Sequence, residues 1–376
     1  MHLSSLHTID FKNYQELQLE FNPQVNCFTG DNGVGKTNLL DAVHYLSMCK
    51  SYFNPVDSQN IRHEQPFFMI RGEFHHKEVS ERIDVAVQKG QKKKVSRKKK
   101  QYDKLSEHIG RYPVVLVTPN DAELILGGSE TRRRFMDVII SQYDRVYLEH
   151  LIRYNKALQQ RNTLLKDMVR SGRFDISALE PWDMQLSEHA KVIHATRKEL
   201  LAQLGPVFNA NYSDISGDQE QVSLSYESHL FEAGMDQLLK ESLTKDRQMQ
   251  YTTTGVHKDD LLFKIGDHPI KKFGSQGQQK SYLLALKLAQ FFLIKEKKGI
   301  KPILLLDDIF DKIDESRVKA LLRAVNDEQF GQIFITDTHP ERMEEVLSGL
   351  SVSSTIFNIK RGNIIERQDI QQQVSA

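Results

Sequence analysis

Cysteine and tryptophan are scarce in this chain of 376 residues, which has two cysteines, Cys27 and Cys49, and one tryptophan. So few cysteines argue against a disulfide scaffold or a cysteine-ligated zinc site. Long hydrophobic runs are also lacking, because every apolar stretch is far shorter than the ~18 residues of a membrane helix. The N-terminal residues Met1–Ser5 carry no basic and apolar leader. We therefore expect a cytoplasmic protein that does not enter a membrane.

An excess of either charge is lacking too. Lysine and arginine number 51 and aspartate and glutamate 50, so the formal net charge is +1. Affinity for a polyanion would therefore have to come from a local patch rather than from the whole surface. The length suffices for one large domain or for two lobes, each with its own core.

A glycine-rich loop is the most informative motif that is present. Residues 30–37, GDNGVGKT, fit the pattern G-x-x-x-x-G-K-[ST], whose backbone N–H groups surround the phosphates of a nucleotide. The strand-like Val25–Thr29 precedes the loop and the helical pattern of Asn38–Met48 follows it, which is the context of an anion site. We predict that the chain binds ATP or GTP. The predicted phosphate-binding residues are Gly30, Asp31, Asn32, Gly33, Val34, Gly35, Lys36, Thr37 and Asn38, and Thr37 is predicted to contact Mg²⁺.

Two adjacent carboxylates end an apolar strand pattern over residues 303–306. The last residues of a buried parallel strand lie at the sheet edge where ligands bind. We predict that Asp307 lies on the Mg²⁺ side, acting through water, and that Asp308 orients or deprotonates the attacking water. The alternative is a strand that ends at an ordinary polar turn.

A second candidate phosphate cradle lies in residues 274–280, GSQGQQK, directly before a long helical pattern over 278–298. Serine and glycine at a helix N-terminus can bind phosphate through backbone N–H groups. Because one triphosphate has no room for two cradles from one compact lobe, this one is predicted to serve a nucleotide on another copy. The alternative is a capped helix start without a ligand.

The pattern along the chain predicts an α/β nucleotide lobe built from both chain ends, with a helical insertion between them. Strand signals occupy the first part and the last third of the chain. Two long helical runs, at 129–171 and 176–211, lie between them, and we expect Pro181 and Gly205-Pro206 to break the second run. The predicted domains are residues 1–123 with 251–376, and the helical residues 124–250.

Together these motifs resemble the ATP-binding-cassette superfamily: a P-loop, an S-x-G-Q signature, an aspartate-ending strand, and a histidine after the next strand. That histidine is His339, which by itself would more often be an ordinary loop residue. The resemblance implies a head-to-tail dimer in which Ser275, Gly277 and Gln278 of one chain contact the γ-phosphate held by Lys36 of the other. It also implies that His339 senses that phosphate.

Over nearly its whole length the chain resembles the RecF family. The matching segments are DFKNY at 10–14, NGVGKTN at 32–38, PND at 119–121, GGSETRRRFMD at 127–137, GVHKDD at 255–260 and the GSQGQQK segment. Single residues depart from the family pattern at Lys12, where arginine is usual, at Glu130, where proline is usual, and at Val256 and Lys258. Two longer segments depart as well. Asp311-Lys-Ile-Asp314 stands where the family reads S-E-L-D, and Ser51-Tyr-Phe53 where it commonly has S-F-R.

This resemblance implies an ATP- and Mg²⁺-dependent DNA-binding recombination mediator in gap repair, replication recovery and the SOS response. Family members form an ATP-driven dimer that acts as a slowly hydrolysing clamp, so the ATPase would be weak and would time the clamp without acting chemically on DNA. They favour duplex DNA next to single-stranded gaps, without sequence specificity, and work with RecR and RecO.

A basic run at residues 91–100 is the candidate DNA contact, because it has seven basic residues and no acidic one. The alternative is a solvated loop. Arg132, Arg133 and Arg134 could contact DNA, or some of them could instead form salt bridges or contact the nucleotide loop, and we leave both readings open. The seven basic residues are Lys92, Lys93, Lys94, Arg97, Lys98, Lys99 and Lys100.

Two other function classes are compatible with a P-loop. A DNA-cleaving enzyme would need a further carboxylate cluster for two metals, and Asp259-Asp260 is the only additional pair. The motor subunit of a membrane transporter is usually shorter and lacks the GVHKDD segment.

Overall fold

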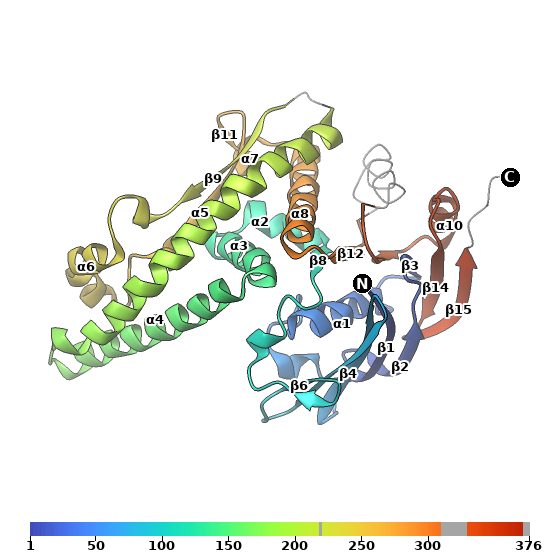
Figure 1. The fold of residues 1–376 in the computed structure, drawn as a ribbon, viewed down its shortest axis with the longest axis horizontal. Coiled ribbons are helices and arrows are strands. Elements are labelled where there is room, and N and C mark those ends of the chain that lie inside the picture. Colours follow the sequence, from blue (N-terminus) through green and yellow to red (C-terminus); the bar gives the residue numbers. More distant parts are fainter. Residues whose placement is uncertain (218–219, 310–328, 371–376) are drawn as a thin grey trace. The chain divides into compact units, whose positions relative to one another are not determined.

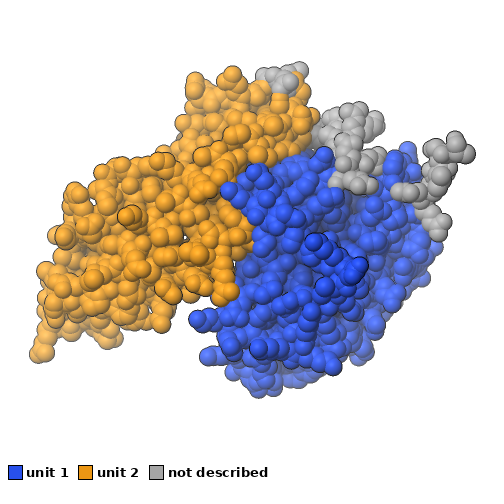
Figure 2. Space-filling model, in the orientation of Figure 1, with its two compact units in different colours: residues 1–121, 284–376 blue, residues 122–283 orange. Residues whose placement is uncertain are grey.

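The computed structural model describes residues 1–217, 220–309 and 329–370. The chain forms two compact units, residues 1–121 with 284–376 (unit 1) and residues 122–283 (unit 2) (Figure 2). The first boundary lies close to the predicted residue 124. The second lies at Leu283 rather than 250, because β10 (Asp260–Ile265) pairs with β9 (Val222–Glu227) inside unit 2. No helix among the described residues is long and apolar enough to cross a membrane.

A mostly parallel sheet carries the nucleotide loop in unit 1 (Figure 1). Five adjacent strands run parallel, and the sixth strand, at one edge of the sheet, is antiparallel. Three short inner strands are buried along their whole length, which is the reason that they are rich in apolar residues. In spatial order the strands are β15 (Asn363–Ile370), β14 (Ser354–Lys360), β3 (Val25–Thr29), β13 (Ile333–Asp337), β12 (Ile303–Asp307) and β8 (Val114–Val117).

A second, antiparallel sheet completes unit 1. The helix α1 (Lys36–Met48) contacts strands of both sheets, and ten of its residues are buried. One apolar core therefore joins the sheets, with Leu39, Leu46 and Phe68 among its fully buried members. The strands in spatial order are β2 (Tyr14–Glu20), β1 (His2–Phe11), β4 (Phe67–His76), β5 (Val79–Gln88), β6 (Lys94–Arg97) and β7 (Lys100–Gln101), and α10 (Pro340–Ser348) follows β13.

Unit 2 contains the long helices α4 and α5, which contact each other and diverge towards the far end of α5 (Figure 1). It is not purely helical, because β9, β10 and β11 form a three-stranded antiparallel sheet. The helix α8 begins in unit 2 and ends in unit 1. The elements are α2 (Ala122–Leu126), α3 (Ser129–Tyr143), α4 (Arg145–Ser171), α5 (Glu180–Ser216), α6 (Met235–Met249), β11 (His268–Pro269), α7 (Ile270–Phe273) and α8 (Gln276–Lys298).

The two helical runs differ from the prediction in where they break. The first is divided at Asp144, whose side chain caps α4 by accepting the N–H of Tyr147. In the second run a short 3-10 helix over Ile176–Ala178 precedes α5, which begins at Glu180, so the predicted break near Pro181 is present and the one at Gly205-Pro206 was wrong. Pro181 lies in the first turn, where its missing N–H costs nothing. Pro206 lies inside α5, whose buried face continues through Leu204 and Phe208 on either side of it. Tertiary packing thus outweighs the local cost of this proline.

Candidate nucleotide site

The glycine loop joins β3 to α1 and takes backbone conformations that only glycine adopts readily. Gly30, Gly33 and Gly35 have φ values of 139°, 81° and 115°. A Cβ at Gly30 would lie 2.3 Å from the carbonyl oxygen of Ile359, and one at Gly35 would lie 2.4 Å from the side chain of Asn13. The turn therefore requires glycine for space as well as for φ, as the sequence pattern predicts.

Lys36 is buried, and its ammonium points back over the loop. It donates hydrogen bonds to the carbonyl oxygens of Gly30 and, at 2.9 Å, Asp31. Burial lowers the pKa of Lys36, while four nearby carboxylates act in the opposite direction. They belong to Asp308, Asp307, Asp337 and Asp31. The cation thus lies between the glycine loop and an acidic sheet edge, as binding of a metal-bound triphosphate requires.

The metal-side residues meet where β12 ends. Thr37 donates its hydroxyl to Oδ1 of Asp307 at 2.9 Å, and Thr336 donates to the same oxygen at 2.8 Å. Burial raises the pKa of Asp307, and the hydrogen bonds from the two threonines oppose that shift. A threonine hydroxyl and a carboxylate oxygen side by side are hard oxygen donors suited to Mg²⁺. The residues named from sequence for the metal are therefore adjacent.

Asp308 follows directly and has a left-handed backbone, with φ 49°. Its Oδ1 is buried and accepts no hydrogen bond from the residues that the structure describes. An unpaired buried carboxylate oxygen is costly unless it receives a donor, for example a ligand water. This observation fits a site for a hydrated metal and a nucleotide.

His339 lies just beyond β13, at the N-cap of α10. Its side chain is 63% exposed, and its Nδ1 is 2.9 Å from the hydroxyl oxygen of Thr338. Its backbone N–H donates to Asp337, a fully buried carboxylate that also accepts from Arg342 at 2.6 Å. Asp337 was missed from the sequence, because its proximity to Lys36 depends on the pairing of β3 with β13.

Asn13 is a second residue that sequence reasoning left without a role. Its amide donates to the carbonyl oxygen of Val34 at 3.1 Å, and its Oδ1 accepts from Asn38 at 2.7 Å. One side chain from the turn between β1 and β2 thus holds the middle of the loop and the first turn of α1. The DFKNY segment was the available signal, because it contains this asparagine.

The serine-led helix start belongs to unit 2 and has the geometry of a capping box. The N–H of Gln278 donates to Oγ of Ser275 at 3.2 Å, and Oε1 of Gln278 accepts the N–H of Ser275 at 2.6 Å. The Gln278 amide also donates to Glu220. Ser275 is exposed and Gly277 is half-buried. The capped start predicted as the alternative is therefore present, and it leaves the serine at the surface.

The basic run folds as the hairpin of β6 and β7, with Lys98 and Lys99 as a two-residue turn at positive φ. Three of its seven basic side chains are held by acids. Lys93 pairs with Asp57 at 2.9 Å, and Arg97 and Lys98 both pair with Glu81. The hydrogen bond from Arg97 lowers the pKa of Glu81 to about 2. The four exposed lysines without an ion pair among the described residues are Lys92, Lys94, Lys99 and Lys100.

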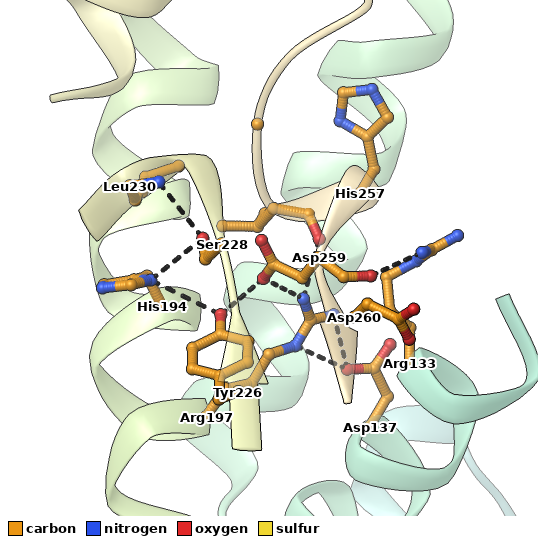
Figure 3. A network of polar contacts seen from close by, with 12 residues as sticks. Arg133, Asp137, His194, Arg197, Tyr226, Ser228, Leu230, His257, Asp259 and Asp260 are labelled. Carbon is orange, nitrogen blue, oxygen red and sulfur yellow. Dashed lines mark hydrogen bonds and ion pairs between the residues drawn. The ribbon is translucent and has the colours of Figure 1, made fainter. Parts of the chain in front are cut away.

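Arginines and aspartates form a buried network in unit 2 (Figure 3). Arg197, 2% exposed, donates to Asp259 at 2.7 Å and to Asp137 at 2.8 Å. Tyr226 also donates to Asp259, and Arg132 forms a bidentate pair with Asp260. The Asp259-Asp260 pair is thus engaged with cations of its own unit rather than held open for metals.

Arg132, Arg133 and Arg134 have different surroundings in the structure, and these bear on whether each contacts DNA or forms a salt bridge. Arg132 forms the pair with Asp260, and Arg133 donates to the carbonyl oxygen of Asp259. Arg134 is exposed. For the first two residues the salt-bridge and structural reading is therefore the correct one.

The structure shows the contacts of some residues that depart from the family pattern, namely Lys12 and the segment Ser51–Phe53. Ser51 and Lys12 both bind the buried carboxylate of Asp41, and Tyr52 donates to Asp121 at 2.7 Å. The ammonium of Lys12 lies 5.4 Å from the centre of the Phe53 ring, a cation–π contact. The Asp311–Asp314 segment lies outside the described residues.

Comparison with known proteins gives the same answer as the motifs. The family described as RecF/RecN/SMC N terminal domain matches residues 2–359. The DNA replication and repair protein RecF of Flavobacterium johnsoniae is 51% identical over 359 residues, which cover 96% of this chain and 100% of the relative. The chain belongs to the RecF family. The resemblance read from its motifs is thereby confirmed.

Another sequence relative and two solved structures are also similar to this RecF family chain. RecF of Phocaeicola vulgatus is 49% identical over 373 residues, covering 98% of this chain and 100% of the relative. A solved structure of the recombination mediator protein RecF with ATP in the RecFOR pathway has a TM-score of 0.86 at 28% identity, covering 98% of each chain. An SMC head bound to a domain of ScpA has a TM-score of 0.58 at 14% identity and shows the fold alone, covering 100% of this chain and 98% of that one. The predicted α/β cassette-type ATPase fold is confirmed.

Proposed function

We propose that this protein is an ATP-dependent DNA-binding recombination mediator that acts in gap repair, replication recovery and the SOS response. Nucleotide binding is supported by one observation, namely that Lys36, Thr37 and Asp307 lie close together at one edge of the sheet. Its relatives are named DNA replication and repair proteins, and a solved relative contains ATP. The proposed place of action is the cytoplasm, and RecR and RecO are the proposed protein partners.

In this proposal the loop of residues 30–38 holds the triphosphate, and Thr37 with Asp307 would hold Mg²⁺. When bound, the metal would act together with Lys36 to neutralise the negative charge of the phosphates. Asp308 takes the attacking water, because its carboxylate oxygen is buried and accepts no hydrogen bond from the described residues. His339, exposed at the start of α10, senses the γ-phosphate.

A second copy of the chain would complete the site. Ser275, Gly277 and Gln278 lie at the exposed start of α8, where backbone N–H groups and the helix dipole favour an anion. With ATP bound, two copies would pair head to tail and close around duplex DNA next to a single-stranded gap. Hydrolysis would be slow and would time the release of the clamp.

The two halves of the site predict opposite behaviour for two substitutions. Lys36→Met removes the loop cation, so we expect ATP to cause no dimerisation. Asp308→Asn keeps the fold of the loop but cannot accept the proton of the water, so the ATP-bound dimer should persist. Size-exclusion chromatography with ATP and Mg²⁺ measures both. An Asp308→Asn protein that elutes like the wild type over time would contradict the clamp.

DNA preference is tested by titration of duplex, single-stranded and gapped DNA, each with ATP and with no nucleotide. We expect ATP to strengthen binding to the gapped duplex most, and Lys36→Met to remove that gain. Equal affinity for all three DNAs, unaffected by ATP, would refute the proposal.

A further inference from the structure

Thr336 connects the side-chain carboxylate of Asp307 with the backbone of Asp308 at the end of β12. In the parallel pairing of β12 with β13, Thr336 lies directly beside Asp307, and the two residues are 0% and 5% exposed. Its hydroxyl donates to Oδ1 of Asp307 at 2.8 Å and accepts the backbone N–H of Asp308 at 2.9 Å. A hydroxyl has one proton and two lone pairs, so this single group acts as donor and acceptor at once.

The backbone of Asp308 needs such support. Its φ of 49° is in the left-handed region, which is unfavourable for residues other than glycine because the Cβ crowds the following carbonyl oxygen. Aspartate tolerates this region better than most residues, but the direction of its side chain still depends on the backbone being held. The hydrogen bond from its N–H to Thr336 is the contact that holds it, and Oδ1 of Asp308 accepts none from the described part of the chain.

We propose that Thr336 is a positioning residue of the ATPase site, whose hydroxyl orients the Asp307 carboxylate and the Asp308 main chain together. This inference rests on the roles that the proposed function gives to the two aspartates. The two hydrogen bonds of its hydroxyl go to Asp307 and Asp308, so Thr336 acts on the metal and the water rather than on the binding of the phosphates.

Two substitutions separate the hydroxyl from the shape of the side chain. Thr336→Val keeps the branched shape and removes both hydrogen bonds, and Thr336→Ser keeps the hydroxyl. Thr355→Val is the matched control, because Thr355 is also fully buried in this sheet, in β14, and its hydroxyl bonds Asp369 instead.

Mn²⁺ titrated into the full-length protein with ATPγS and followed by electron paramagnetic resonance reports the metal site. We expect Thr336→Val to weaken Mn²⁺ binding by about 10- to 100-fold, the usual loss when a group orienting a metal ligand is removed. The rate of hydrolysis should fall similarly, while ATP affinity in EDTA stays at the wild-type value. Thr336→Ser should restore both properties, and Thr355→Val should not change them.

Hydrogen exchange gives a readout that needs no nucleotide. In Thr336→Val the Asp308 amide loses its acceptor, so the peptide spanning residues 303–309 should exchange faster than in the wild type. Unchanged exchange and unchanged Mn²⁺ affinity would overturn the inference, as would a Thr336→Ser protein as defective as Thr336→Val. If the wild type binds no ATPγS, the proposed function fails, and the exchange rate still decides whether Thr336 holds Asp308.

Discussion

The four exposed lysines of the basic run allow a quantitative test of the DNA contact. Lys92, Lys94, Lys99 and Lys100 lie on and beside the β6–β7 hairpin. Each lysine that neutralises a phosphate releases a counterion and adds about 0.9 to the slope of log affinity against log salt. If all four contact DNA, changing them to glutamine should flatten the slope by about 3.6. Between 50 and 200 mM salt the wild type would then lose about 10²-fold more affinity than the variant.

The control for this experiment comes from the same hairpin. Lys93 and Arg97 have their charges paired with Asp57 and Glu81, so changing both to glutamine should leave the slope almost unchanged. Fluorescence anisotropy of labelled gapped duplex with ATP, at a series of salt concentrations, measures each slope. If the four-lysine variant kept the wild-type slope, or if the paired residues changed it equally per charge removed, the hairpin would be a solvated turn and not a DNA contact.

Two further predictions concern unit 2, where the fluorescence of Trp182 reports unfolding in urea. Arg197→Met leaves Asp259 buried and uncompensated, so the free energy of unfolding should fall by about 3–5 kcal/mol. The exposed Arg145→Met, which breaks the pair with Glu149, should change it by less than about 1 kcal/mol, and equal effects would contradict the reasoning. Burial lowers the pKa of His257 to about 4, so the unfolded state binds its proton first as the pH falls below about 6.5. Stability should therefore decrease from pH 6.5 towards pH 4, and a slope that His257→Gln does not reduce would exclude this histidine as its source.

The GSQGQQK segment at residues 274–280 shows that one sequence motif can be compatible with two different roles. The same SQGQ letters predict a phosphate cradle for a second copy and a capped helix start. The structure has the capping box, with Ser275 and Gln278 bonded to each other, and an exposed Ser275. Local geometry is thus compatible with both interpretations, because a capping hydroxyl and a phosphate both satisfy the free N–H groups at a helix start.

Features that depend on neighbouring residues could be read from the sequence alone. The loop of residues 30–37 requires glycine for its own backbone angles, and buried parallel strands require continuous apolar runs. The nucleotide loop, the aspartates after residue 306 and the α/β class were therefore predictable.

Tertiary structure decided the features that depend on residues far apart in the chain. Thr336 reaches Asp307 only because β12 pairs with β13, and Glu81 neutralises Arg97 only because β5 pairs with β6. The helix α5 continues through Pro206 because its buried face packs on both sides of it. Sequence determines which chemical groups are available, whereas long-range strand pairing and packing determine which of them meet.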